Sequence, residues 1–247
     1  MGGGTMAQAP PAQSSAQPSR QRPPDGGIRA TLVSILIPSM PNAAFSATLN
    51  TKSTQQLPNG AEIILVNHRK IARDSAGRIF QERRMLVPDD GAHESVLTQI
   101  EISDPVKHEL YICKPEEHVC QLEKFSPVEG DDPSVIGKEP TGPGVERLGK
   151  QTIEGFETTG IRQSAEIPAG KIGNDRVLIT TREYWYAPRL GVNLLSTRDD
   201  PHAGKQEFRV TEIVPGEPDT SLFRPPPDAK ILDLRNPPET PAPASPD

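Results

Sequence analysis

The sequence has few aromatic residues and no long apolar run. Aromatic residues make up 4% of its 247 residues, and hydrophobic residues make up 34%. A core of this composition has to be thin and built largely from Ile, Val and Leu. The most apolar stretch, residues 32–37 (LVSILI), ends at Pro38 and is far shorter than the ~18 apolar residues of a membrane-spanning helix. We therefore expect no transmembrane segment, and we interpret residues 30–37 as a possible strand.

The sequence also lacks an excess of positive charge. Its net charge is −6, whereas a protein that binds nucleic acid needs a basic face to contact phosphates. We therefore expect no nucleic-acid partner. The 28 Pro and 20 Gly residues interrupt the chain so often that long helices are disfavoured.

Catalytic and metal-binding motifs are missing as well. The sequence contains no GxSxG elbow and no phosphate-binding GxxxxGK[ST] loop. Asp199–Asp200–Pro201–His202 has ligand types for a cation, but a capped turn is the common interpretation of Asp-Pro. We expect no enzyme, no cofactor and no metal site. Five histidines have no metal-like spacing: His68, His93, His108, His118 and His202.

The two cysteines, Cys113 and Cys120, flank the segment KPEEHV. Their spacing is too wide for a CxxC redox motif, and no second pair exists to build a zinc site. A hairpin turn at KPEEHV would place them directly opposite each other, with Cβ atoms about 4.5–5.5 Å apart. Their matched positions favour a disulfide over two reduced cysteines packed on one sheet face. A disulfide predicts an oxidising compartment.

The N-terminus gives a weaker indication of location. Residues 1–4 (MGGG) lack the basic and apolar regions of a secretory signal peptide. The protein is therefore either cytoplasmic, or periplasmic or secreted with a signal peptide that is missing from this sequence. Ala7–Gln8–Ala9 resembles the small residues near a cleavage site. We expect the periplasmic or secreted location, with the cytoplasm as the alternative.

Alternating apolar residues and frequent turns predict about nine or ten antiparallel strands in a mainly β chain. Asn59–Gly60 and the DSAG sequence at residues 74–77 are typical of hairpin turns. PDTSLF, at residues 218–223, predicts a short helical turn after an Asp cap. We expect a β domain at residues 30–234 with a long loop at residues 126–146. Residues 1–29 and 235–247 are too polar and Pro-rich to fold, which predicts disorder.

One predicted hairpin, at residues 69–84, is unusually basic. A solvated face is the ordinary interpretation of such a charge cluster. The functional alternative is a binding site for an anionic headgroup or an acidic protein partner. The candidate partner-binding residues are Arg69, Arg78, Arg83 and Arg84.

The stretch from Leu148 to Phe223 is the most informative part of the chain. It contains the one tryptophan, Trp185, between Tyr184 and Tyr186. The simplest role of Trp185 is in the core. The alternative is that it lines a ligand cavity, because such cavities favour aromatic walls.

The order of features after residue 176 resembles a known family. The YWY run is followed by the turn LGV, the strand EFRVTEIV and then DTSLF before a proline. This order resembles the LolA/LolB/RseB-like superfamily of periplasmic lipoprotein carriers. FSATLNT and RKIARDSAGRIFQERR are similar to that family's opening strands. The sequence is also similar to uncharacterised secreted bacterial proteins that share strings such as RDSxGR, IPAG and IGND. The likeness covers residues 44–233.

The resemblance implies an open half-barrel made of one curved antiparallel sheet with few short helices. Such carriers shield acyl chains on a concave apolar face. The resemblance thus implies a non-enzymatic binding protein for a lipid, acyl chain or other hydrophobic ligand. The candidate ligand-binding residues are Phe45, Tyr184, Trp185 and Tyr186. The alternative is an interaction or envelope-sensor module that uses the basic hairpin 69–84 and contacts a protein such as a lipoprotein.

Overall fold

A computed structural model describes residues 35–125 and 141–236. The predictions of disorder for residues 1–29 and for nearly all of residues 235–247 lie outside these ranges. Residues 126–140 of the predicted long loop also lie outside them. The same holds for residues 30–34 of the possible first strand.

The described residues form one sheet of 13 strands. Its first half is a meander in which successive long strands pair antiparallel. The two-residue strand β4 pairs with β2 outside the main strand order. The strands of this half are β1 (Phe45–Gln56), β2 (Glu62–Arg73), β3 (Ile79–Arg84), β4 (Val87–Pro88), β5 (Leu97–Asp104), β6 (Glu109–Lys114) and β7 (Val119–Lys124).

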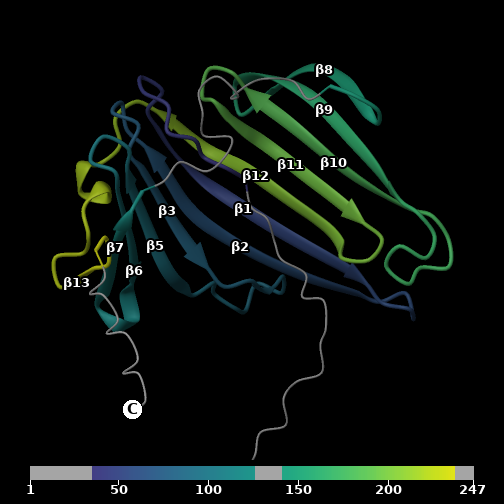
Figure 1. Ribbon diagram of the computed structural model, residues 1–247, viewed down its shortest axis with the longest axis horizontal. Helices are drawn as coiled ribbons and strands as arrows, with labels where there is room; N and C mark the ends of the chain where they lie inside the picture. Colours follow the sequence, from purple (N-terminus) through teal and green to yellow (C-terminus); the bar gives the residue numbers. More distant parts are fainter. Residues whose placement is uncertain (1–34, 126–140, 237–247) are drawn as a thin grey trace, which may run out of the picture. The chain divides into compact units, whose positions relative to one another are not determined.

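The second half is another antiparallel meander, and its last long strand, β12, returns to pair with β1. This pairing joins the two meanders into one sheet, with β12 and β1 side by side at its centre (Figure 1). The strands of this half are β8 (Val145–Ile153), β9 (Phe156–Ile167), β10 (Leu178–Ala187), β11 (Val192–Asp200), β12 (Gly204–Pro215) and β13 (Lys230–Asp233).

One strand corrects the expectation of a purely antiparallel sheet. Strand β13 pairs with β7 in parallel, with Ile231 opposite Cys120. The strand count also exceeds the nine or ten expected. The four-residue β13 and the two-residue β4 are too short to show an alternating pattern.

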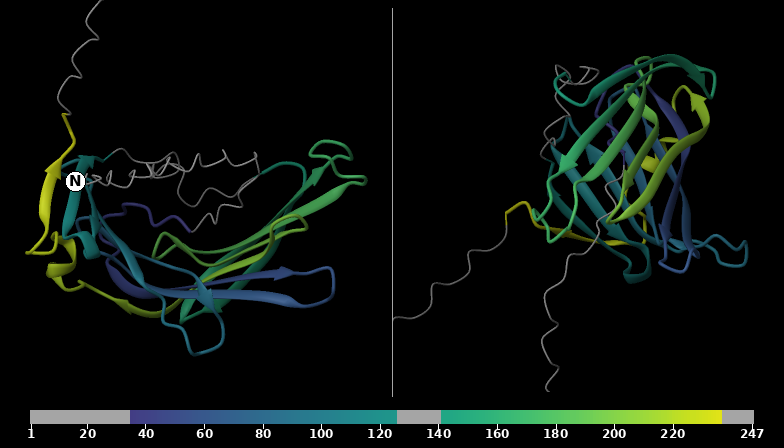
Figure 2. Two further views of the ribbon diagram at one scale, coloured as in Figure 1. Left: turned by 90° about the horizontal axis from the view of Figure 1, so that it is seen from below. Right: turned by 90° about the vertical axis from the view of Figure 1, so that its right-hand side faces the viewer.

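The sheet is curved and does not close on itself. Its order runs from β13 at one edge to β8 at the other, and both ends rise on the same side (Figure 2). The predicted fold of one mainly β sheet curved into an open half-barrel is thus confirmed, apart from the parallel β13.

Helical structure in the described ranges is limited to two short 3-10 turns, η1 (Pro115–Glu117) and η2 (Thr220–Phe223). The Asp219 side chain accepts a hydrogen bond from the backbone N–H of Ser221 at 2.9 Å, which confirms the predicted Asp cap. Within these ranges, no helix has the length and hydropathy needed to cross a membrane.

At the central strands, the main core lies on the inner side of the sheet. The side chains of Phe45, Leu49, Ile71 and Val210 point to one face of the central strands and are buried. Residues 35–44 pack on this face through Ile35 and Ile37, and Figure 2 shows this purple segment inside the curve. We call this side the inner face. Residues 35–37 are not a strand, so the expected strand is wrong for its described part.

A smaller core lies on the outer face of β3 and β5. It contains Ala72, Phe80 and Ile102, and the η2 residue Phe223 packs onto it. Ala72 lies between Ile71 and Arg73 on β2, and neighbouring strand residues point to opposite faces. The turn at η2 therefore covers the opposite face from the segment 35–44.

Arg73 is fully buried at the end of β2 and connects three parts of the chain. Its Nε and Nη2 atoms donate to Ala43 O at 3.0 and 2.8 Å, and Nη1 donates to Pro38 O at 2.8 Å. Nη2 also donates to Leu190 O. The guanidinium lies 5.1 Å from the centroid of the Phe45 ring. Burial lowers the pKa of Arg73 to about 10, so the side chain is still charged at neutral pH.

Trp185 is packed so closely that its neighbour on β9 has to be a glycine. Gly160 lies opposite Trp185, and a Cβ atom at Gly160 would come within 2.5 Å of the indole ring. The indole Nε1 donates to Glu183 Oε1 at 2.9 Å. Trp185 is 9% exposed and belongs to the main core cluster, although its register through Leu195 to Arg209 places it on the face opposite to the inner face. Its side chain is therefore part of the core, the simpler of the two expected roles.

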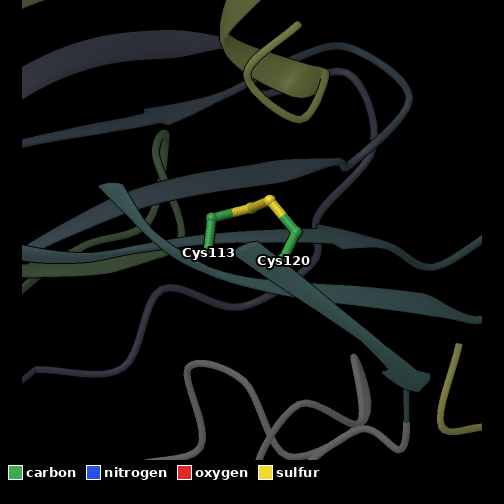
Figure 3. Close-up of a disulfide and its surroundings, with 2 residues drawn as sticks. All are labelled: Cys113 and Cys120. Carbon is green, nitrogen blue, oxygen red and sulfur yellow. A yellow bond between two sulfur atoms is a disulfide. The ribbon is translucent and has the colours of Figure 1, made fainter. Parts of the chain in front are cut away.

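The two cysteines lie opposite each other on β6 and β7. Their sulfur atoms are bonded at 2.03 Å, as Figure 3 shows. The 3-10 turn η1 makes the connection, and His118 follows it in the left-handed conformation (φ 51°). Both cysteines are buried, so the disulfide pins the hairpin next to the parallel strand β13.

We predict that Arg73→Lys lowers the free energy of unfolding by about 2–4 kcal/mol, because an ammonium cannot satisfy three separated carbonyl groups as the planar fork does. Urea denaturation monitored by Trp185 fluorescence measures the change. The control is Arg209→Lys, at an exposed residue paired with Glu207, which should change stability by less than about 0.5 kcal/mol. Equal losses in the two variants would contradict the role assigned to Arg73.

We predict that the disulfide also forms in protein purified from its native host. Alkylation under thiol-trapping conditions should label no cysteine before reduction and both cysteines after it, as read by intact mass. Replacing both cysteines with Ser should lower the free energy of unfolding by about 2–3 kcal/mol, since the closed loop is short. Two alkylated thiols before reduction would exclude the bond.

Candidate functional site

A row of side chains crosses the inner face from β2 to β9. The register places each member directly opposite the next one, on six neighbouring strands. Directly opposed side chains have Cβ atoms about 4.5–5.5 Å apart, so they form a continuous surface. We call this row the inner strip. Its members are Asn67, Thr51, Phe208, Ser196, Tyr184 and Ile161.

The middle of the inner strip is less covered than its flanks. Phe208 is 4% exposed and Ile161 is 8% exposed, whereas Ser196 and Tyr184 between them are only half-buried. A phenol ring and a hydroxyl thus offer contact area between two apolar side chains. Such a surface can bind an apolar ligand by burial, with a hydroxyl at each half-covered position.

A second row, two residues further along each strand, is polar. It consists of amide and guanidinium groups, and every one of them carries hydrogen-bond donors. The spacing along a strand puts the two rows about 6.6–6.8 Å apart. We call this second row the polar row. Its members are Gln206, Arg198, Arg182 and Gln163.

Arg198 in the polar row is held by a buried carboxylate. Its Nη2 donates to Asp200 Oδ2 at 2.8 Å. Asp200 also accepts from the backbone N–H of His202 at 2.9 Å. Burial works against ionisation of Asp200, but the hydrogen bonds from His202, Arg198 and Ala203 hold its pKa below the ordinary value. The DDPH segment is therefore a capped turn that positions an arginine.

The four residues predicted to bind a ligand do not form one surface. Phe45 is completely buried beneath Arg73, and Trp185 belongs to the core. Tyr184 and Tyr186 are half-buried and, by strand alternation, point to the opposite side of β10 from Trp185. Burial raises the pKa of Tyr186, and the positive charge of Arg73 opposes this rise. Of the four predicted residues, Tyr184 is the one on the inner strip.

The basic hairpin 69–84 is largely neutralised by its own surroundings. Arg83 makes a bidentate ion pair with Glu101 at 2.9 and 2.7 Å. Arg78 pairs with Asp74 at 2.6 Å, and Arg84 pairs with Glu82 at 2.8 Å. The four predicted partner-binding arginines therefore do not form a free cationic patch, because three of them pair with carboxylates and Arg69 is buried.

Arg69 lies where the ladder between β2 and β3 ends. Backbone pairing stops at Ile71, and beyond it Arg69 Nη1 donates to Glu82 O at 3.2 Å. Asn67 Nδ2 donates to Arg84 O at 2.8 Å. Burial is the main cause that lowers the pKa of Arg69 to about 10. These side chains take over from the backbone ladder and hold β3 beside β2.

A polar depression of about 340 Å³ lies elsewhere, and its lining includes Thr48, Asn50 and His68. Most of its lining belongs to the outer face. Asn50 donates to Thr211 Oγ1 at 2.7 Å, and Thr48 donates to Glu212 Oε2 at 2.6 Å. These groups satisfy one another, so we favour the half-covered inner strip as the candidate site. The described ranges hold no group of three or more His, Cys, Asp or Glu residues arranged to bind a metal ion.

Only part of this site could be predicted from the sequence. Nothing in the sequence distinguishes Ile161, Ser196 and Phe208 as site residues, because an isolated strand residue carries no sign of which strand it will face. Alternation within β10 gives a usable clue, since it places Tyr184 and Trp185 on opposite faces of the strand. The carboxylates that neutralise the hairpin were also visible in the sequence, since Asp74 lies four residues before Arg78 and Glu82 lies two before Arg84.

No protein-family model and no curated protein sequence matches the chain. Solved structures do match, at low sequence identity. One is an uncharacterised conserved protein from Thermus thermophilus, which is 11% identical with a TM-score of 0.42; the match covers 77% of this chain and 90% of that one.

Two further structures match with lower scores. MucB, in its complex with MucA from Pseudomonas aeruginosa, is 14% identical with a TM-score of 0.41; the match covers 76% of this chain and 58% of that one. A LolA-superfamily protein from Nitrosomonas europaea is 9% identical with a TM-score of 0.31; the match covers 76% of this chain and 92% of that one.

We predict that the Arg83–Glu101 pair has a structural role. Arg83→Glu should lower the free energy of unfolding by about 1 kcal/mol or less, since the pair is partly exposed and two carboxylates would then face each other. The double variant Arg83→Glu with Glu101→Arg restores the opposite charges and should recover most of the loss. Urea denaturation of the wild type, both single variants and the double variant measures this coupling. Additive losses would contradict it.

Proposed function

We propose that the protein is a non-enzymatic binding protein of an extracytoplasmic compartment and that its inner face takes a lipid, an acyl chain or another hydrophobic ligand. The observation that carries this proposal is the half-covered centre of the inner strip. Tyr184 and Ser196 are half-buried there, between the buried Phe208 and Ile161.

The architecture supports the proposal. A sheet with an apolar face usually needs a second layer to cover it. The described segment 35–44 provides such a cover for one part of the inner face, over Phe45, Leu49 and Ile71. No strand or helix of the described ranges forms a layer over the strip where β9, β10 and β11 meet. An apolar ligand would supply the missing contacts there.

The chemistry of the inner strip fits binding better than catalysis. Its side chains are an aromatic ring, aliphatic groups, hydroxyls and an amide, which contact a ligand by burial and hydrogen bonding. Catalysis of acid–base or nucleophilic steps needs a nucleophile or a titratable group within reach of its partner. The hydroxyl groups of Ser196 and Tyr184 have no His, Asp, Glu, Lys or Cys among the six members of the strip to activate them.

The disulfide supports an extracytoplasmic location. Cys113 and Cys120 are bonded in a short hairpin. Stable disulfides are common in secreted and periplasmic proteins and rare in the cytosol of most organisms. The thiol-trapping experiment described above therefore also tests the location.

We predict that delipidated protein binds a fluorescent fatty acid and that Tyr184→Ala weakens this binding about five- to tenfold, because the ring supplies apolar contact area. The matched control is Ile179→Ala. Ile179 is on the same strand, points to the opposite face and is 55% exposed. A fluorescence titration of the three proteins gives their Kd values.

Two results would count against the proposal. If the wild type does not bind the fatty acid at all, the inner face does not take an acyl chain. If Ile179→Ala weakens binding as much as Tyr184→Ala does, the ligand does not bind on the inner strip.

A further inference from the structure

Two arginines face each other on the inner face, directly beside the inner strip. The register places Arg182 of β10 opposite Arg198 of β11. Like charges in directly opposed positions of a sheet repel and destabilise the pair of strands. Gln163 and Gln206 flank the arginines on the neighbouring strands. The four residues thus place amide and guanidinium donors side by side.

Among the described residues, a carboxylate neutralises only one of these two arginines. Arg198 pairs with Asp200 at 2.8 Å. Arg182 is exposed, and no described residue forms a hydrogen bond or ion pair with it. The polar row and the inner strip contain no carboxylate, and Asp200 lies two residues beyond Arg198 on β11. With one carboxylate for two guanidinium groups, the pair keeps a net positive charge.

Arg198 also has one unsatisfied hydrogen-bond donor. Its Nε atom is buried and has no hydrogen-bond partner in the described structure. A buried donor without an acceptor is unfavourable, and such groups in native structures usually have a role or an unseen partner. A bound anion would supply an acceptor and would relieve the repulsion between the two guanidinium groups at the same time.

The position beside the inner strip indicates what kind of anion would bind. Arg182 lies two residues before Tyr184 on β10, and Arg198 lies two residues after Ser196 on β11. The two guanidinium groups therefore lie within one row of an acyl chain that contacts Tyr184 and Ser196. Planar guanidinium groups match carboxylate and phosphate oxygens in a bidentate geometry.

We infer that Arg182 and Arg198 form a subsite for the anionic headgroup, a carboxylate or a phosphate, of the ligand whose chain lies on the inner strip. This inference rests on the proposed function and gives its ligand a class: a single-chain anionic amphiphile. In this assignment, Asp200 positions Arg198, and Arg182 makes contact with the headgroup from the exposed side.

The test compares ligands that share one chain and differ in their headgroup. Hexadecanoate, hexadecyl phosphate and hexadecanol compete with the uncharged probe N-phenyl-1-naphthylamine on delipidated full-length protein. The wild type should bind at least one of the two anionic ligands about tenfold or more tightly than the alcohol. The anion that gains more identifies the headgroup as carboxylate or phosphate.

The variants are Arg182→Gln and, as a matched control, Arg209→Gln on the outer face. Arg182→Gln should lose the preference for the anion and keep its affinity for hexadecanol, while Arg209→Gln should behave like the wild type. Because Arg182→Gln removes a like-charge contact, its Tm should be unchanged or higher, which separates lost recognition from lost folding.

The possible failures can be told apart. If the wild type binds the alcohol and both anions equally, or if Arg182→Gln keeps the preference, the headgroup subsite is wrong and the apolar site stands. If neither the probe nor any of the three ligands binds, the proposed function itself fails, and the subsite fails with it.

Discussion

The buried charge of Arg73 is the interaction on which the inner core depends. Its guanidinium has no solvent contact and is held by carbonyl oxygens of Pro38, Ala43 and Leu190 and by the face of the Phe45 ring. A buried charge is unfavourable unless its donors are satisfied. The segment 35–44 and the turn after β10 therefore have to stay against β2, which keeps Ile35 and Ile37 in the core.

The second constraint is the pairing of β1 with β12. Strands β2 to β11 separate β1 from β12 in the sequence, yet β1 and β12 lie side by side in the sheet with Leu49 opposite Val210. Local hairpins can form early, but this contact requires closure of a very long loop, which is slow and costs entropy. The inner strip crosses this junction between Thr51 and Phe208. A binding surface of this kind therefore exists only once the two halves of the sheet have joined.

The sequence predicted local features well because local physics determines them. The Asp219 cap and the opposed cysteines follow from residues close together in the chain. The parallel pairing of β13 and the β1–β12 junction did not follow, since they depend on contacts between distant segments. Arg73 shows the same limit. In the sequence it is one more cation in a basic hairpin, and only the tertiary structure places three carbonyl groups around it.

The two edges of the sheet also have a consequence for how separate copies of the protein behave. An exposed strand edge invites pairing with another chain, and short strands, bulges and charges are known protections against it. At one edge, β13 has only four residues. At the other, β8 has a register shift between Arg147 and Gly149, with Lys150 beside it. Both edge strands thus oppose the edge-to-edge pairing that turns open sheets into fibres. The half-barrel can therefore stay open without acting as a template for aggregation.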